Sequence, residues 1–307
     1  MPVTHLKPIS ALTRVCAVFG HPIRHSASPA LQHAGITALG LDWRYLAFDV
    51  APDRLEAAVT GAKAMRFVGL NLTVPHKEAA IGFVDVLDES ARAWGAVNTI
   101  VFEAPDADGR WIPIGQLPDQ DIPIVRVHGY NTDADALSRS IEEDLGLRLS
   151  GARVFLLGTG GAGRTAALRL ASGGVGALYL YNRTRSKAAV VADEIRQRHP
   201  AVHVEVAEPE SPVDLVVNAT SLGLRPDDPL PLDTGRWPLS RAGAVYDMIY
   251  RPTETPLLRH ARAAGCRTAN GLGMLLYQGA RALELWSGKA APLALMRRAL
   301  EAEVARA

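Results

Sequence analysis

A glycine-rich turn in the second half of the chain could bind the phosphates of a dinucleotide. Residues 158–163 read Gly-Thr-Gly-Gly-Ala-Gly and match the pattern G-x-G-x-x-G. The turn follows an apolar run at 154–157 and precedes a segment of helical periodicity, which is the context that a dinucleotide site requires. There Gly158 permits the tight turn, Gly160 lets the backbone approach a pyrophosphate, and Gly163 lets helix and strand pack closely. The free N–H groups at the start of the helix then attract the phosphates.

The end of the next apolar run indicates which dinucleotide would bind. An NAD site places Asp or Glu there to bond the ribose 2′-hydroxyl. This chain has Asn182-Arg183-Thr184, with Arg185 and Lys187 just beyond. A guanidinium group suits a 2′-phosphate, because the two form charge-assisted hydrogen bonds. The alternative is an ordinary solvated helix start, but cations there oppose the helix dipole by ~0.3–1 kcal/mol. The residues favour NADP.

Two alternating series of strands and helices would position these groups. In the first third of the chain, strands are predicted at 15–19, 45–50, 67–72 and 98–103, and helices at 28–39, with Ser28 as N-cap, and at 53–64. Alternation of this kind predicts a largely parallel sheet covered by helices. The proline-rich stretch 104–127 has no helical period and is predicted to be an extended loop or hairpin.

A second alternating series, which starts at Arg153, predicts a Rossmann-type domain. Helices are predicted at 134–145, ending at Gly146, at 164–171 and at 186–198, and strands at 154–157, 178–181, 202–206, 215–217 and 244–246. The chain from Leu272 onward reads as wholly helical, and we expect it to pack on the first domain or to bridge the two. The predicted domains are a substrate-binding α/β domain, 1–132 completed by 271–307, and an NADP-binding domain, 133–270.

Composition excludes several other classes of protein. The net charge of +1 gives no electrostatic case for nucleic acid or an anionic membrane as a partner, and no apolar run approaches the ~20 residues that span a bilayer. Cys16 and Cys266 are far apart and suit buried or free thiols in a reducing cytoplasm. No zinc cluster is visible. The chain has only five lysines, so a lysine within a polar motif, such as Lys77, is conspicuous.

Polar side chains in the first domain follow its predicted strands, at the edge where open α/β sheets bind ligands. They are Ser26, Ser28, Asn71, Thr73, Asn98 and Asp133. Hydroxyl, amide and charged groups of this kind suit a polyhydroxy carboxylate. Each residue also has a purely structural alternative, since Ser28 can cap a helix and Asn98 can stand in a turn.

These segments resemble the shikimate dehydrogenase family, in order along nearly the whole chain. The similar motifs of the first domain are Gly20-x-Pro-x-x-His-Ser-x-Ser-Pro29, Asn71-Leu-Thr-Val-Pro-His-Lys77, Gly95-Ala-Val-Asn-Thr99 and Gly129-Tyr-Asn-Thr-Asp133. Beyond the glycine turn and Asn182-Arg183-Thr184 they are Asn218-Ala-Thr-Ser221, Tyr246-Asp-Met-Ile-Tyr250 and Asn270-Gly-Leu-Gly-Met-Leu275 with Gln278.

The resemblance implies NADP-linked interconversion of shikimate and 3-dehydroshikimate, in the route to aromatic amino acids, by two α/β domains. It implies Lys77 and Asp133 as the catalytic pair. It also implies substrate contacts from Ser26, Ser28, Thr73, Asn98, Tyr250 and Gln278. The cofactor would be lined by Gly158, Thr159, Gly160, Gly161, Ala162, Asn182, Arg183, Thr184, Arg185, Ser186, Lys187, Met248 and Gly271, with Glu89 as a further candidate.

The chemistry asked of the pair is proton transfer, because a nicotinamide carries the hydride. The reference pKa of lysine, ~10.4, is high for a base at neutral pH. Burial would lower the pKa of Lys77 and a neighbouring Asp133 would raise it, and the sequence leaves both open. The alternatives are that Lys77 is a surface residue at a helix start after Pro75, and that Asp133 caps the helix beginning at Ala134.

Two features depart from the family pattern, and rival functions remain open. The stretch 104–127 is longer than expected, and Ala134-Asp135-Ala136 replaces the usual glycines. The rivals are a quinate or aminoshikimate dehydrogenase of the same family, and a non-catalytic NADP-binding protein. Retention of both serines and of Asn182-Arg183-Thr184 favours shikimate and NADP. We expect a monomer or a homodimer, with a small molecule as substrate.

Overall fold

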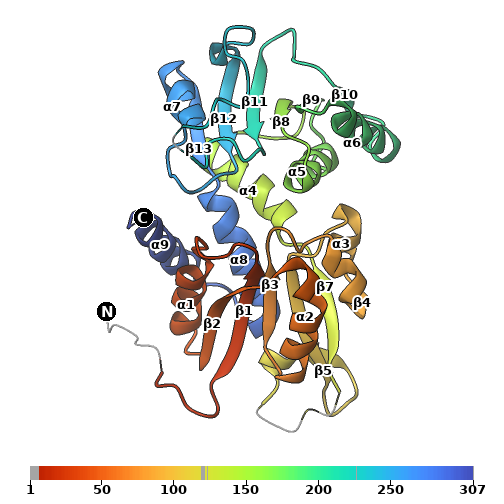
Figure 1. Cartoon of the computed structure of the whole chain (residues 1–307), viewed down its shortest axis with the longest axis vertical. Coiled ribbons are helices and arrows are strands. Elements are labelled where there is room, and N and C mark those ends of the chain that lie inside the picture. The colour runs from red at the N-terminus through yellow and green to blue at the C-terminus, as the bar shows by residue number, and fades with distance from the viewer. Residues whose placement is uncertain (1–6, 119–121, 123, 226, 307) are drawn as a thin grey trace. The chain divides into compact units, whose positions relative to one another are not determined.

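The structure, a computed structural model, describes residues 7–118, 122, 124–225 and 227–306 and divides into two compact units (Figure 1). Unit 1 comprises Met1–Asp133 and Leu276–Ala307, and unit 2 comprises Ala134–Leu275. Each unit contains one β-sheet with helices packed on it. No helix in the described part of the chain is long and apolar enough to cross a membrane.

The described strands of unit 1 form a mixed sheet in the order β2-β1-β3-β5-β7-β4, with β6 paired to β5. Their bounds are β1 Arg14–Gly20, β2 Trp43–Asp49, β3 Gly69–Leu72, β4 Val86–Leu87, β5 Thr99–Pro105, β6 Trp111–Pro113 and β7 Arg126–Tyr130. The pairs β1–β2, β1–β3 and β4–β7 are parallel, but β5 runs antiparallel to each of its three partners. The prediction of a largely parallel sheet is therefore wrong for half of the pairs.

The direction of β5 follows from the connections on either side of it. A parallel neighbour needs a long crossover that returns the chain to the start of the sheet. After β3 the chain returns through a 3-10 turn (Ala79–Phe83) and forms the short strand β4, which is parallel to β7. The six-residue helix α3 (Glu89–Trp94) then leads into β5 at the edge where β4 ends, without a second crossover. After β5 the chain folds straight back into β6, which confirms the hairpin alternative for the first part of 104–127; residues 119–121 and 123 of that stretch lie outside the described residues.

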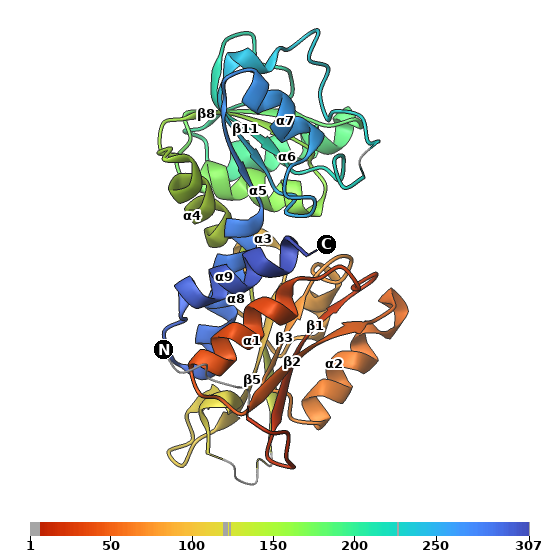
Figure 2. The ribbon, with the colours of Figure 1, turned by 90° about the vertical axis from the view of Figure 1, so that its left-hand side faces the viewer.

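Helices cover both faces of the sheet in unit 1. On one face α2 (Leu55–Ala64), preceded by a 3-10 turn at Pro52–Arg54, packs Leu55, Val59 and Ala62 against a core of β1, β3 and β5 side chains. On the other face lie α1 (Ser28–Ala38), α8 (Leu272–Ser287) and α9 (Leu293–Val304) (Figure 2). The N-cap of α1 is Ala27, whose side chain makes no capping bond, so the prediction of Ser28 as N-cap is wrong by one residue.

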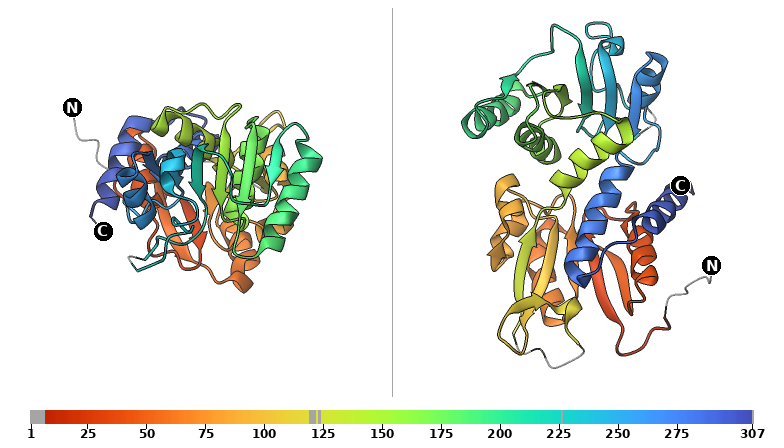
Figure 3. Two further views of the ribbon diagram at one scale, coloured as in Figure 1. Left: turned by 90° about the horizontal axis from the view of Figure 1, so that it is seen from above. Right: turned by 180° about the vertical axis from the view of Figure 1, so that it is seen from behind.

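The C-terminal helices return to unit 1, as one of the two expectations had it (Figure 3, right). The indole of Trp286 on α8 is fully buried, and its Nε1–H donates to the backbone oxygen of Ile100 over 3.0 Å. Gly69 on β3 allows this fit, because a Cβ there would lie 2.0 Å from Trp286 Nε1. On α1, the Gln32 amide donates to the backbone oxygen of Gly279 on α8 over 2.8 Å.

Unit 2 has the doubly wound Rossmann topology. Its strands are β8 Arg153–Leu157, β9 Ala177–Tyr181, β10 His203–Glu205, β11 Val213–Asn218, β12 Ala242–Asp247 and β13 Arg267–Asn270. They are all parallel, in the order β10-β9-β8-β11-β12-β13, which is 3-2-1-4-5-6 in sequence terms. The helices are α4 Asp133–Leu145, α5 Gly161–Ser172, α6 Arg185–Arg198 and α7 Pro256–Ala263. The predicted strands are all present; β13 and α7 were not predicted.

We predict that Trp286 anchors α8 to the sheet of unit 1. Trp286→Ala would lose a buried indole and leave a cavity against β3, so the free energy of unfolding should fall by about 3–5 kcal/mol. The measurement is urea-induced unfolding followed by circular dichroism. Lys289→Ala, an exposed change just beyond the same helix, is the control and should stay within about 0.5 kcal/mol of the parent. A loss below about 1 kcal/mol for Trp286→Ala would contradict this role.

Candidate functional site

The glycine turn of unit 2 has the backbone geometry that its sequence pattern predicts. Gly158 follows β8 directly with φ +94°, a left-handed conformation that favours glycine. At Gly163, in the first turn of α5, a Cβ would lie 2.2 Å from the backbone oxygen of Gly158. The strand end and the helix start therefore touch, and only glycine fits at this position.

The start of α5 presents unpaired hydrogen-bond donors. Its N-cap is Gly160, and no side chain caps the helix. Within the described residues, the backbone N–H groups of Gly161 and Ala162 have no acceptor, and both residues are exposed. The neighbouring Thr159 is buried, and its hydroxyl lacks a hydrogen-bond partner in the described part of the chain. Donors in this arrangement suit an anion such as a pyrophosphate.

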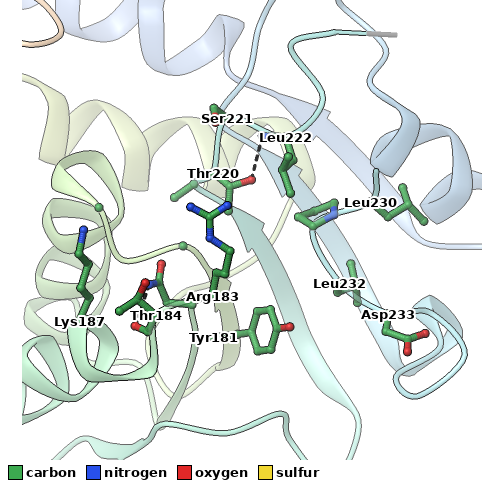
Figure 4. A pocket seen from close by; sticks show the side chains of 15 residues that line it. Tyr181, Arg183, Thr184, Lys187, Thr220, Ser221, Leu222, Leu230, Leu232 and Asp233 are labelled. Atoms are coloured by element: carbon green, nitrogen blue, oxygen red, sulfur yellow. Dashed lines mark hydrogen bonds between the residues drawn. The ribbon is translucent and has the colours of Figure 1, made fainter. Parts of the chain in front are cut away.

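A cavity of about 630 Å³ opens beside the turn (Figure 4). Six of the predicted cofactor residues line it: Gly158, Gly160, Asn182, Arg183, Thr184 and Lys187. It is also lined by Tyr181, Ala219, Thr220, Ser221, Leu222, Leu230, Pro231, Leu232 and Asp233, to which the sequence reasoning gave no role. The motif Asn218-Ala-Thr-Ser221 was a signal for three of these residues, whereas the segment 230–233 carries no recognisable pattern.

The amide of Asn182 joins the glycine turn to the cationic loop. Its Oδ1 accepts from the N–H of Thr159 over 3.1 Å, and its Nδ2 donates to the oxygen of Thr184 over 2.9 Å. Arg183, the next residue along the chain, therefore lies beside the turn, and its side chain points toward Thr220 (Figure 4). The end of β9 thus supplies both an amide that holds the turn and a cation that faces the cavity.

Three cationic side chains at the start of α6 form no ion pair with a carboxylate of the described residues. Arg183, Arg185 and Lys187 are exposed, and no carboxylate in the described residues forms an ion pair with them. The first turn of α6 contains no acidic residue. Arg183 and Lys187 line the cavity, whereas Arg185 and Ser186 lie outside its lining. Unpaired cations beside a cavity of nucleotide size suit a phosphate better than a bare helix start does.

The remaining predicted cofactor residues adjoin each other at the ends of β12 and β13. The N–H of Gly271 donates to the oxygen of Ile249 over 3.1 Å, and a Cβ on Gly271 would lie 2.2 Å from the oxygen of Met248. Neither Met248 nor Gly271 belongs to the lining of the cavity. Tyr250, predicted to contact the substrate, is half-buried in this loop of unit 2.

In unit 1 the structure brings Lys77 and Asp133 together. Lys77 Nζ lies 2.6 Å from Asp133 Oδ2, and the side chains are 29% and 11% exposed. Lys77 precedes the 3-10 turn and lies in no helix, so it is not a helix-start residue. The carboxylate of Asp133 faces the lysine, and it is Asn131 Oδ1 that accepts from the N–H of Asp133 over 3.1 Å where α4 begins.

The loop that carries Lys77 is held from two sides. His76 is buried and hydrogen-bonds through Nε2 to the oxygen of Val50 over 2.8 Å. Burial lowers the pKa of His76, which keeps the imidazole neutral at physiological pH. The oxygen of Lys77 accepts from the N–H of Val97 over 2.8 Å. Sequence reasoning gave His76 no role, although it stands within the motif that contains Lys77.

A buried polar network surrounds the other predicted substrate residues of unit 1. Asn98 is 1% exposed; its Nδ2 donates to Thr132 Oγ1 over 3.0 Å, and its Oδ1 accepts from the N–H of Thr132 over 2.8 Å. Asn71 accepts from the Tyr45 hydroxyl over 2.8 Å and donates to Thr99 Oγ1 over 3.1 Å. Tyr45 and Thr132 were not predicted, because neither stands out from the sequence alone.

The loop that carries Ser26 and Ser28, called here the serine loop, follows β1 and begins beside the end of β3. A Cβ on Gly20, the last residue of β1, would lie 2.4 Å from Cγ2 of Thr73, so the segments that follow β1 and β3 touch. Within the serine loop, Ser26 Oγ accepts from the N–H of Ser28 over 3.3 Å, and the Ser28 side chain is buried. Gln278, on α8, is also buried in unit 1. Every predicted substrate residue except Tyr250 therefore belongs to unit 1.

Comparison with known proteins identifies the family. The model of the shikimate dehydrogenase substrate binding domain matches residues 18–100, that of shikimate / quinate 5-dehydrogenase matches 139–223, and that of the shikimate 5′-dehydrogenase C-terminal domain matches 271–301. The shikimate dehydrogenase (NADP(+)) of Symbiobacterium thermophilum is 42% identical, and the alignment covers 93% of this chain and 93% of that relative. The chain belongs to the shikimate dehydrogenase family.

Solved structures of the family share the fold. The shikimate 5-dehydrogenase of Thermus thermophilus, in complex with NADP(H) and shikimate, is 33% identical with a TM-score of 0.78, covering 94% of this chain and 99% of that one. Quinate dehydrogenase from Corynebacterium glutamicum, in complex with NAD, is 28% identical with a TM-score of 0.77, covering 94% and 99%. The family thus includes proteins named for different hydroxy acids and crystallised with different dinucleotides.

We predict that Arg183 distinguishes the two dinucleotides. Arg183→Ala should raise the Michaelis constant for NADP at least about tenfold, because a charge-assisted hydrogen bond worth roughly 1.5–3 kcal/mol would be lost. The constant for NAD should change much less, and steady-state kinetics with both cofactors measures the difference. Arg196→Ala, which removes an exposed cation paired with Asp193 on the same helix, is the control and should change neither constant. Equal rises for NADP and NAD would refute this role.

Proposed function

We propose that the chain is an NADP-dependent shikimate dehydrogenase, which reversibly reduces 3-dehydroshikimate to shikimate. The observation that carries the proposal is the contact between Lys77 Nζ and Asp133 Oδ2, 2.6 Å long, among buried hydroxyl and amide side chains. An ammonium group beside a carboxylate can give up a proton and recover it. The family relationship supports the same reaction.

The residues of unit 2 fit NADP. The orphaned Thr159 hydroxyl and the free N–H groups of Gly161 and Ala162 would bind the pyrophosphate, and Arg183 and Lys187 would bind the 2′-phosphate. Asn182 would hold the turn, Thr184, Arg185 and Ser186 would complete the rim, and Met248 and Gly271 would add further contacts to the cofactor. The bound cofactor supplies the hydride.

The residues of unit 1 would orient the substrate. Ser26 and Ser28 would donate hydrogen bonds to the carboxylate, which carries the negative charge of shikimate. Thr73, Asn98 and Gln278 would bind the ring hydroxyls, and Tyr250 is the remaining residue proposed to contact the substrate. Asn98 is held rigidly by Thr132, so its position is set before the substrate arrives.

Lys77 would move the proton. In the reductive direction the carbonyl carbon gains a hydride and its oxygen gains a proton from Lys77 Nζ, which gives the secondary alcohol. In the reverse direction Lys77 accepts the hydroxyl proton while the hydride leaves. Asp133, 2.6 Å from Nζ, holds the lysine in place, and its negative charge favours the ammonium form. After the reduction the neutral Lys77 regains its proton from solvent, and after the oxidation it releases one to solvent.

Quinate is the second candidate substrate, because a quinate dehydrogenase shares the fold. Quinate carries an extra ring hydroxyl. Both serines are present here, and the cations at the start of α6 are free of acids in the described residues, which supports shikimate and NADP. An assay that offers shikimate and quinate, each with NADP and with NAD, decides between them; absence of turnover with shikimate and NADP would refute the proposal.

We predict that Lys77→Ala lowers the turnover number by about 10²–10⁴-fold, because general acid–base catalysis contributes that much. Shikimate binding, measured by calorimetry, should remain largely intact. Lys63→Ala is the matched control: Lys63 Nζ pairs with Asp85 Oδ2 over 3.1 Å, so it removes another lysine–aspartate pair of unit 1 outside the site and should leave turnover unchanged. A near-normal turnover number in Lys77→Ala would refute the proposal that Lys77 transfers the proton.

A further inference from the structure

A buried carboxylate stands at the end of β12, where the strand meets the cofactor side of the sheet in unit 2. Asp247 has no exposed surface, and no cation in the described residues forms an ion pair with it. It accepts three hydrogen bonds: from Asn218 Nδ2 over 3.0 Å, from the N–H of Ile249 over 3.1 Å and from Thr255 Oγ1 over 2.6 Å. None of these three donors belongs to the predicted site.

A carboxylate in this position is costly to the fold. Burial raises the pKa of Asp247, because it disfavours the charged form, while the three hydrogen bonds oppose that shift. All three partners donate, which matches an ionised carboxylate that only accepts. Each of the three hydrogen bonds fixes a different segment of unit 2.

The first hydrogen bond leads to the cofactor cavity. Asn218 ends β11; besides Asp247, its Nδ2 donates to the oxygen of Leu222 over 3.2 Å. Its Oδ1 accepts from both the N–H and the hydroxyl of Thr220, over 3.0 and 2.7 Å. Thr220 and Leu222 line the cavity, and Leu222 N–H in turn donates to the Thr220 hydroxyl (Figure 4). The amide of Asn218 thus shapes this wall, and Asp247 orients the amide.

The second hydrogen bond leads to the loop that carries Met248 and Tyr250. The N–H of Ile249 donates to Asp247, and the N–H of Met248 donates to the oxygen of Asn218 over 3.0 Å. The oxygen of Ile249 accepts from Gly271. The third hydrogen bond is the anchor, since Thr255 is buried and its hydroxyl also caps α7 by accepting from the N–H of Leu258.

We propose that Asp247 is a positioning residue that holds the 219–222 loop and the 248–250 loop in register, so that affinity for the dinucleotide and for the hydroxy acid depends on it. The part concerning the hydroxy acid rests on the proposed function, whereas the part concerning the dinucleotide does not. Asp247 touches neither ligand; it acts through Asn218 and through the backbone of Ile249.

The test is the dissociation constant of NADPH, measured by fluorescence titration of the full chain without substrate. Asp247→Ala should raise it about tenfold, because three buried donors lose their acceptor. Asp247→Asn keeps the shape and the Oδ1 acceptor, so about a threefold rise is expected, and Thr255→Val, which removes the anchor alone, should behave similarly. The Michaelis constant for 3-dehydroshikimate should rise with the Ala variant, and kcat should change less than either constant.

Two controls separate positioning from stability. Val213→Ala truncates a buried side chain at the other end of β11 and should lower the melting temperature without changing NADPH binding. Asp214→Asn alters a carboxylate on the same strand that accepts from the N–H of Arg153, and it should change neither. NADPH dissociation constants within twofold of the parent in both Asp247 variants would overturn the proposal.

The outcomes also separate the two proposals. Weaker NADPH binding in the Asp247 variants of a chain that does not turn over shikimate would refute the proposed function and leave the role of Asp247 standing. If Asp247→Ala does not fold, Asp247→Asn and Thr255→Val decide, and unchanged NADPH binding in both would refute the role. Shikimate turnover with normal NADPH binding in both variants would leave the function standing and refute the role.

Discussion

The placing of Asn98 beside the Lys77–Asp133 pair depends on one constraint, the antiparallel direction of β5. Because β5 runs against both β3 and β7, those two strands point the same way and end at the same edge of the sheet. Lys77 follows β3, and Asp133 follows β7. The start of β5, with Asn98 just before it, falls between them. A parallel β5 would begin at the opposite edge and would carry Asn98 away from the pair.

The parts of this fold that could be predicted from sequence are those set by local patterns. The pattern G-x-G-x-x-G predicts the backbone roles of its own glycines. The tight turn at Gly158 and the close helix–strand contact at Gly163 were therefore predicted correctly from sequence. The direction of β5 could not be predicted in that way, because it depends on whether the preceding connection crosses over, and the short elements β4 and α3 gave no periodic signal. Likewise, residues 230–233 line the cavity but carry no sequence motif. The tertiary fold brings them to the cavity, and no local pattern predicts that position.

The charged groups discussed for the two units are arranged differently. In unit 2, the cations at the start of α6 form no ion pair with a carboxylate of the described residues. The carboxylate of Asp247 is buried at the end of β12 and accepts hydrogen bonds from three neutral donors. In unit 1, the cation and the carboxylate of the site are paired. A free cation suits binding of an anionic ligand, a buried lone carboxylate suits the fixing of loops, and a close pair suits movement of a proton. Each arrangement thus matches the role proposed for it.

The most direct test of this account is kcat for reduction of 3-dehydroshikimate by NADPH in Asp133→Asn. This variant keeps the size and hydrogen-bonding reach of the side chain but removes the charge that holds Lys77. If the pair acts as a unit, kcat should fall by at least about 100-fold while the dissociation constant of NADPH stays unchanged. A kcat within twofold of the parent would show that Lys77 needs no carboxylate partner and would contradict the account.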